Sequence, residues 1–168
     1  PIENTLTREP DLYDHLLWQI HLSDFAPRER EIAELIVGNL NPDGFLVASL
    51  DEIRDLASAG LEQPLAMEQV AAVLTRVQRL DPPGIACPNL RDSLLLQLDL
   101  RGEPGDSLTR RVLAEHWELF LRRQYAVIAR ALDVTLAALE PVIEDIKTLQ
   151  TRPGRKFTND RTHYIEPD

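Results

Sequence analysis

Apolar residues recur along most of this chain at the three- and four-residue spacing that places side chains on one face of an α-helix. The first such repeat, Leu12, Leu16 and Ile20, predicts a helix over about residues 11–22. The same spacing predicts seven more helices, at about 27–40, 49–58, 66–80, 88–100, 108–122, 125–132 and 136–149. We therefore expect an all-α protein of about eight helices.

Turn formers and capping residues divide these helices. Ser49 and Glu52 have the spacing of a capping box, in which each side chain bonds the backbone N–H of the other residue. The stretch "RGEPGDS" at 101–107 is the best linker, so we expect two helical subdomains, 1–101 and 107–168. Pro141 predicts a bend in the last helix, or a later start for it. The tail from residue 151 has no helical period and is expected to be extended.

A weak internal repeat relates the two predicted subdomains. In each, a short helix, a turn and a longer helix follow one another, and a Pro-Gly stop ends the longer helix. At one constant offset, the apolar positions Val70, Val73, Val77 and Leu80 match Leu139, Val142, Ile146 and Leu149. This order of elements predicts one helix-turn-helix-like pair in each half.

The stretch "TRVQRLDPPGIACPNLRDSLLLQL" at 75–98 has two opposed interpretations. It could be a reactive loop with Cys87 as nucleophile, but no histidine lies near that cysteine in the sequence. It is better explained as a stiff joint between two helices, because proline cannot continue a helix and glycine permits a positive φ. The residues of this structural hinge are Leu80, Asp81, Pro82, Pro83, Gly84 and Pro88, with Pro88 expected in the first turn of the next helix.

The net charge of −10 is unevenly distributed. Residues 1–105 carry 8 Lys/Arg and 18 Asp/Glu, whereas the remainder carries 10 of each. An acidic first part is a poor candidate for binding duplex DNA, which needs a basic face. It suits a basic protein partner, or it serves solubility alone.

Other features limit the location and the chemistry of the chain. One cysteine excludes an internal disulfide, and no apolar run approaches the roughly 20 residues that span a bilayer, so a cytoplasmic protein without membrane contact is expected. His15 and His21 are six residues apart, and on a helix they point in different directions. We find no phosphate loop, nucleophile elbow or metal-spaced cluster, so neither an enzyme nor a cofactor is expected.

Three stretches carry a resemblance to a known family. They are "LYDHLLWQIHLSDFAPREREIAELIVGNLNPDGFL", "VLTRVQRLDPPGIACPNLRDSLLLQL" and the terminal "YIEPD". In this order, and over nearly the whole chain, they resemble the core-binding domain of the bacterial sigma-54 (RpoN) family of transcription initiation factors. One departure is that Cys87 and Pro88 stand where family members usually have alanine and arginine, which removes a charged group from this loop.

The resemblance implies an all-helical domain of two subdomains that docks on core RNA polymerase, chiefly on the beta flap and beta-prime. It also implies that promoter DNA at the −24/−12 elements is read by other parts of the full factor, and that an AAA+ activator acts through an amino-terminal region, both absent from this chain. Candidate polymerase contacts are the charged residues Arg28, Arg30, Glu31, Asp43, Asp51 and Asp55.

The alternative function is a helix-turn-helix nucleic-acid-binding module. It draws on the predicted helix pairs and on the arginines of the second half. Its candidate nucleic-acid contacts are Arg152, Arg155 and Lys156 in the tail.

Overall fold

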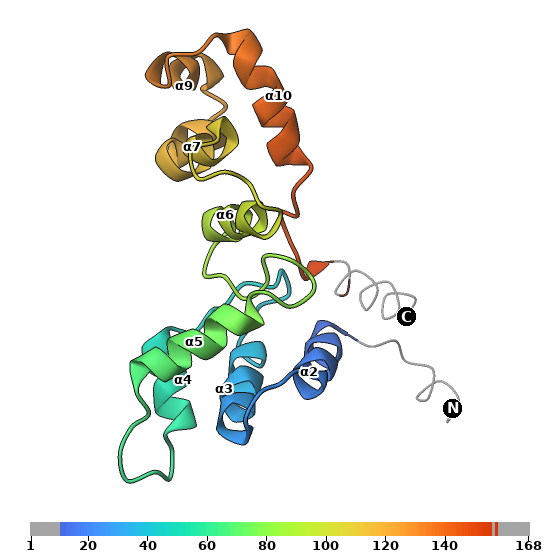
Figure 1. The fold of residues 1–168 in the computed structure, drawn as a ribbon, viewed down its shortest axis with the longest axis vertical. Helices are drawn as coiled ribbons and strands as arrows, with labels where there is room; N and C mark the ends of the chain where they lie inside the picture. The colour runs from blue at the N-terminus through green and yellow to red at the C-terminus, as the bar shows by residue number, and fades with distance from the viewer. Residues whose placement is uncertain (1–10, 156, 158–168) are drawn as a thin grey trace, which may run out of the picture. The chain divides into compact units, whose positions relative to one another are not determined.

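The structure, a computed structural model, describes residues 11–155 and 157. The described residues form an all-α fold, as predicted (Figure 1). The nine helices of this part are α2 (Leu12–Leu22), α3 (Pro27–Val37), α4 (Leu50–Ala57), α5 (Met67–Val77), α6 (Leu90–Leu100), α7 (Leu108–Glu115), α8 (Trp117–Leu121), α9 (Tyr125–Ala131) and α10 (Leu136–Lys147). They belong to two compact units: unit 1 comprises the chain up to Pro88 and again from Arg152, and unit 2 comprises Asn89–Thr151.

In unit 1, helices α2 to α5 enclose a single apolar core. Helix α3 is central, because it packs on α2, α4 and α5. The fully buried side chains include Leu16 and Ile20 of α2 and Ile32 and Ile36 of α3. The predicted capping box starts α4 as expected, since Ser49 Oγ accepts from the Glu52 N–H at 3.1 Å and the Glu52 carboxylate accepts from the Ser49 N–H at 2.8 Å.

In unit 2, helices α6 to α10 enclose a second core. The side chains of Leu94 and Leu98 on α6 are buried together with Val112 and Leu113 on α7. The predicted repeat has a structural counterpart here, because the equivalent stripes of α5 and α10 are the buried faces of both helices. Helix α5 packs on α3 and α4, and α10 packs on α7 and α9.

The boundary between the units differs from the predicted linker at 101–107. The helix that starts the second unit is α6, which the sequence analysis assigned to the first subdomain, and the chain from Arg152 returns to unit 1. The physical reason is burial: Leu94 and Leu98 complete the core of unit 2. Turn-forming composition alone does not show which core the flanking helices join.

Several helices also end or begin at residues other than those that the apolar periodicity predicts. The expected helix over 108–122 is interrupted at His116, whose φ of −132° and ψ of 36° are not helical, so that α8 starts a new turn. Trp117 and Phe120 of α8 then stack with ring centroids 6.1 Å apart, and Phe120 lies against Tyr125 with centroids 6.2 Å apart. Helix α10 begins at Leu136 and runs through Pro141, so the later start that we considered is wrong.

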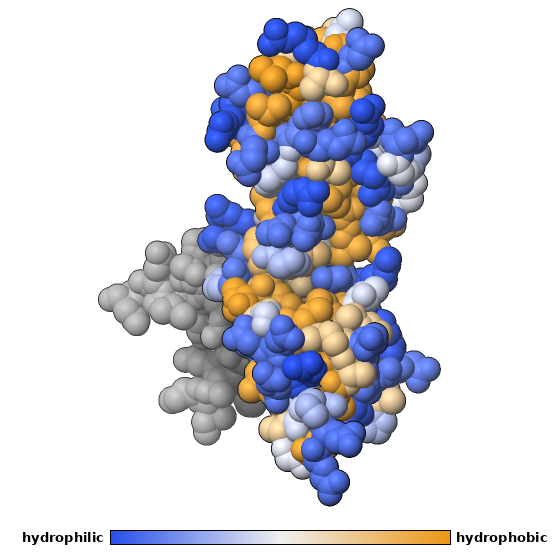
Figure 2. All heavy atoms as spheres, turned by 90° about the vertical axis from the view of Figure 1, so that its left-hand side faces the viewer, coloured by the Kyte–Doolittle hydropathy of each residue, from blue (hydrophilic) through white to orange (hydrophobic). Residues whose placement is uncertain are grey.

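The tail is described only up to residue 157. At its start the backbone turns, because the Arg155 N–H donates to the carbonyl of Arg152 at 3.0 Å. Within the described residues, no helix is both long and apolar enough to cross a membrane. On the face shown in Figure 2, apolar side chains reach the surface in several separate areas between charged ones.

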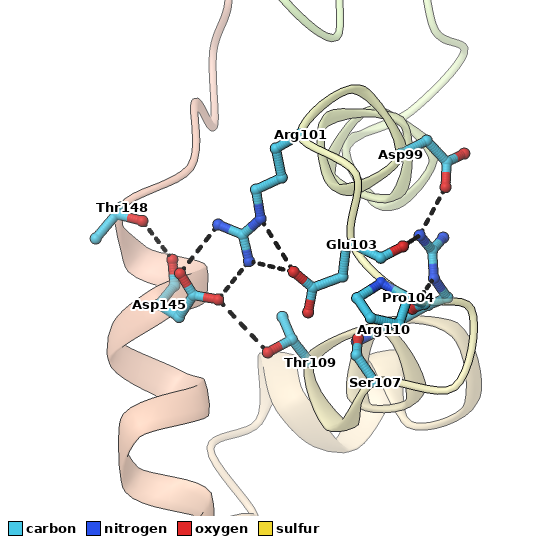
Figure 3. Close-up of polar contacts among 9 residues, drawn as sticks. All are labelled: Asp99, Arg101, Glu103, Pro104, Ser107, Thr109, Arg110, Asp145 and Thr148. Carbon is cyan, nitrogen blue, oxygen red and sulfur yellow. Dashed lines mark hydrogen bonds and ion pairs between the residues drawn. The ribbon is translucent and has the colours of Figure 1, made fainter.

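The predicted linker is instead a fixed loop of unit 2 (Figure 3). The Arg110 guanidinium donates to the carbonyls of Glu103 and Pro104, at 3.0 and 3.2 Å, and lies 2.7 Å from the Asp99 carboxylate. Arg101, at the end of α6, reaches the carboxylates of Glu103 at 3.0 Å and of Asp145 on α10 at 3.1 Å. These contacts join the loop to both α7 and α10.

The Arg101–Asp145 pair makes the stability of unit 2 depend on pH. The hydrogen bond from Arg101 holds the pKa of the Asp145 carboxyl below its ordinary value of 3.8, although partial burial opposes this. A carboxyl whose pKa is lowered on folding stabilises the protein above its unfolded pKa of about 4. That contribution is lost as the pH falls through the lowered folded pKa.

We therefore predict that Asp145→Asn lowers the stability of unit 2 near neutral pH by less than about 1 kcal/mol, because the pair is partly exposed. The difference from wild type should shrink as the pH falls below about 4. Thermal melts followed by circular dichroism across this pH range measure it, with Glu140→Gln on the exposed face of α10 as the control. A difference that stays constant with pH would contradict the assignment.

Candidate functional site: a junction of three loops in unit 1

The hinge predicted at 80–88 lies in a junction of three loops. The first loop, "NPDGFL" at 41–46, follows α3 and is a tight turn: the Gly44 N–H donates to the Asn41 carbonyl at 2.9 Å, and the Asn41 N–H donates to the Phe45 carbonyl at 2.8 Å. Gly44 has a φ of +95°, in the left-handed region that glycine adopts without strain. The Asn-Pro-Asp-Gly sequence therefore forms the turn that its composition predicts.

The second loop contains the hinge itself, and its centre, from Gly84 to Cys87, is buried. Gly84 uses the positive φ that we expected glycine to permit, at +82°. Ile85, Ala86 and Cys87 are all 2% exposed or less. The Ala86 N–H donates to the Gly44 carbonyl at 2.8 Å, and the Cys87 carbonyl accepts from the Leu46 N–H at 2.9 Å. This loop is therefore part of the unit 1 core.

The third loop, at Pro153–Gly154, returns from unit 2. The Gly154 N–H donates to the carbonyl of Asp43 at 2.9 Å, and the Arg155 guanidinium lies 3.1 Å from the Asp43 carboxylate. Phe157 stacks on the ring of His15, with centroids 5.2 Å apart. The segment after unit 2 thus packs on the first loop and on α2, and so belongs to unit 1.

Two glycines make this close approach possible. A Cβ atom on Gly44 would lie 2.6 Å from Ile85 Cδ1 and 2.9 Å from the backbone nitrogen of Gly154. A Cβ on Gly154 would lie 2.8 Å from the Pro42 carbonyl oxygen and 2.9 Å from the Gly44 nitrogen. Any side chain at either position would separate the loops.

Helix α2 holds the hinge at Asp81. The Asp81 N–H donates to the Gln19 side-chain oxygen at 2.8 Å, and the Gln19 side-chain nitrogen donates to the Asp81 carbonyl at 2.6 Å. His15 Nε2 lies 2.9 Å from the Asp81 carboxylate. The Gln19 side chain thus satisfies both the N–H and the carbonyl of Asp81. Because Pro82 follows, these two groups cannot be satisfied by a continuing helix.

Some details of the predicted hinge change. Helix α5 ends at Val77, and a turn continues to Leu80, whose N–H donates to the Val77 carbonyl at 3.0 Å. We expected Pro88 in the first turn of the next helix, and this is wrong: Asn89 is the N-cap of α6 and accepts from the Asp92 N–H at 2.8 Å, so Pro88 precedes the helix. Cys87 is buried, which fits a packing role.

The candidate polymerase contacts lie on three separate elements. On α3, Arg28 and Glu31 form an exposed pair at 3.7 Å. On α4, both Asp51 and Asp55 are exposed and lie 3.9 and 3.5 Å from Arg54. Asp43 differs from these, because its carboxylate holds Arg155 inside the junction.

The candidate nucleic-acid contacts are divided as well. Arg152 is exposed, Arg155 is paired with Asp43, and Lys156 lies outside the described residues. The described residues contain no group of three or more His, Cys, Asp or Glu side chains that could hold a metal ion. The junction offers packing and backbone hydrogen bonds, and its polar side chains are engaged with one another.

Sequence reasoning missed the partners of the hinge. The sequence pattern singles out His15 only as a candidate metal ligand, does not single out Gln19, and marks Gly154 only as part of a helix stop. The repeat of Pro-Gly after both long helices was an available signal, because Ala86, two residues after the first stop, and Gly154, in the second, both bond to the turn at Gly44. The sequence analysis also did not identify the exposed apolar side chains of α2, Trp18 and Leu22.

From the close contact of the loops we predict that Gly44→Ala lowers the free energy of unfolding. The variant should lose about 2–4 kcal/mol of stability, because it combines a positive φ with contacts that backbone atoms cannot relieve. Gly102→Ala is the matched control, with a φ of +80° and no atom within 4 Å of its added Cβ. It should lose only about 1 kcal/mol. Equal losses in chemical denaturation would show that the loops are not in close contact.

Comparison with known proteins identifies the family of this chain. The family model described as "Sigma-54 factor, core binding domain" matches residues 1–168. The chain is similar to proteins named RNA polymerase sigma-54 factor from Pseudomonas aeruginosa and Azotobacter vinelandii, both 36% identical over 94% of this chain and 32% and 31% of theirs. The Escherichia coli factor is 33% identical over 94% of this chain and 33% of its own length. The chain spans about a third of these relatives, and it belongs to the sigma-54 factor family as its core-binding domain.

Proposed function

We propose that this chain binds core RNA polymerase and attaches a sigma-54-type factor to it during transcription initiation. The single observation that carries this proposal is the match of the core-binding domain model to all 168 residues. The binding acts through surface complementarity, without catalysis or a cofactor. The beta flap and beta-prime are the docking sites that the family resemblance suggests.

The geometry supports a rigid adaptor. The centre of the hinge loop is buried and hydrogen-bonded to the turn at Gly44, so unit 1 presents preformed surfaces to a partner. Preformed surfaces lose less conformational freedom on binding, which favours affinity. Asp51 and Asp55 on α4 stay in the proposal as candidate polar contacts at the rim, whereas Asp43 is better explained by its pair with Arg155.

The alternative, nucleic-acid binding through a helix-turn-helix, is less well supported. In such motifs the second helix of the pair enters the major groove. The corresponding helix of unit 2 is α10, and its exposed face carries Glu140, Pro141 and Glu144. Lys147, on the same helix, is paired with Glu144 at 3.4 Å. A face with this charge repels phosphate. We propose that promoter DNA and the activator are contacted by parts of the factor outside this chain.

The proposal predicts that the purified chain binds core RNA polymerase without the rest of the factor, with a dissociation constant in the micromolar range or tighter. Biolayer interferometry with immobilised core enzyme measures this at low and moderate salt. A fluorescent duplex carrying −24/−12 elements is the comparison, and we expect no saturable binding to it. Binding to the duplex but not to the polymerase would favour the alternative.

A further inference from the structure

We propose that Trp18 and Leu22 on α2 form the apolar anchor by which unit 1 docks on core RNA polymerase, in an apolar pocket with a basic rim. This inference rests on the proposed function and deepens it by naming the contact surface. The two side chains are 61% and 68% exposed and lie one turn apart on the same helix.

The position of these residues on α2 follows from helix geometry. Leu16 and Ile20 are fully buried and define the inner face, which packs on α3. At 100° per residue, Trp18 lies on the opposite side of the helix from this face, and Leu22 lies one turn further along beside it. The exposure of Trp18 and Leu22 therefore follows from their positions in the helix. A small rotation of α2 could not bury them while Leu16 and Ile20 stay buried.

Helix α2 is held in place by contacts that do not involve the exposed stripe. Its first turn is fixed by a capping box, in which Asp11 accepts from the Asp14 N–H at 2.9 Å. Its middle is fixed by Gln19, which binds both backbone groups of Asp81. An anchor on a fixed helix costs little ordering on binding, and tryptophan in such a position commonly dominates the energy of an interface.

The charge around the stripe indicates the partner. Asp14 lies one turn before Trp18, and His21, beside Leu22, lies 3.1 Å from the Glu34 carboxylate. The first 105 residues also carry an excess of ten acidic groups. An apolar stripe with an acidic border fits an apolar pocket bordered by lysine or arginine, and this complementarity would speed association at low salt.

The test compares two exposed apolar pairs of unit 1 for binding to core polymerase. W18A/L22A removes the proposed anchor. V47A/L56A is the matched control, because Val47 and Leu56 are 65% and 53% exposed and lie before and on α4. Melting temperatures and circular dichroism should stay near wild type for both variants, since neither pair supports the core.

We expect W18A/L22A to weaken binding about 30-fold or more, the size of a hot-spot loss, and V47A/L56A to change it less than about threefold. Trp18→Phe should recover part of the loss. Wild-type affinity in W18A/L22A overturns the inference and leaves the proposed function standing. A wild-type chain that does not bind polymerase overturns both.

A second copy of the chain is the competing occupant. Light scattering across a concentration series measures the mass of the free chain and of W18A/L22A. Equal, monomeric masses support the assignment to polymerase. A wild-type dimer that W18A/L22A converts to monomers would assign the stripe to self-association and overturn the inference.

Discussion

The close contact of two glycine backbones, Gly44 and Gly154, is the constraint on which the rest of unit 1 depends. Because neither residue has a side chain, the turn after α3 and the segment after α10 can approach within backbone hydrogen-bonding distance. This contact makes the chain from Arg152 part of unit 1, so unit 2 is an insertion between Pro88 and Arg152. Within unit 1, the hinge loop and the segment from Arg152 therefore bond to the same turn, through Ala86 and Gly154.

Burial favours a stiff joint over a reactive loop at this hinge. A nucleophile needs access and a base, whereas Cys87 is 2% exposed and its carbonyl is bonded to Leu46. A buried loop must satisfy its backbone polar groups, which explains the bonds of Ala86 to Gly44 and of Cys87 to Leu46. Prolines reduce the number of groups to satisfy, because they have no backbone N–H.

Local rules predicted local structure well and long-range structure poorly. The helices, the Ser49–Glu52 capping box and the turn at Gly44 follow from spacing and from residue type. The domain boundary did not, because "RGEPGDS" has the composition of a linker, yet Arg101 and Arg110 tie it to α7 and α10. The partners of Asp81 and Asp43 are 62 and 112 residues away in sequence, and nothing in the pattern of Gln19 or Arg155 specifies such a pairing.

The acidic excess of the chain has two physical uses that sequence alone does not separate. Asp43 and Asp145 are engaged within their own units, each with an arginine, and they stabilise loop positions. Asp51 and Asp55 on α4 are exposed, and both lie near one arginine, Arg54, so a net negative charge remains there. Only carboxylates of this second kind can shape the approach of a basic partner, since the field of a paired charge is largely cancelled at a distance. Trp18 and Leu22 have no charge, so they act only at short range. Long-range attraction by the acidic surface would therefore come first in the association with polymerase, and apolar contact through α2 would follow it.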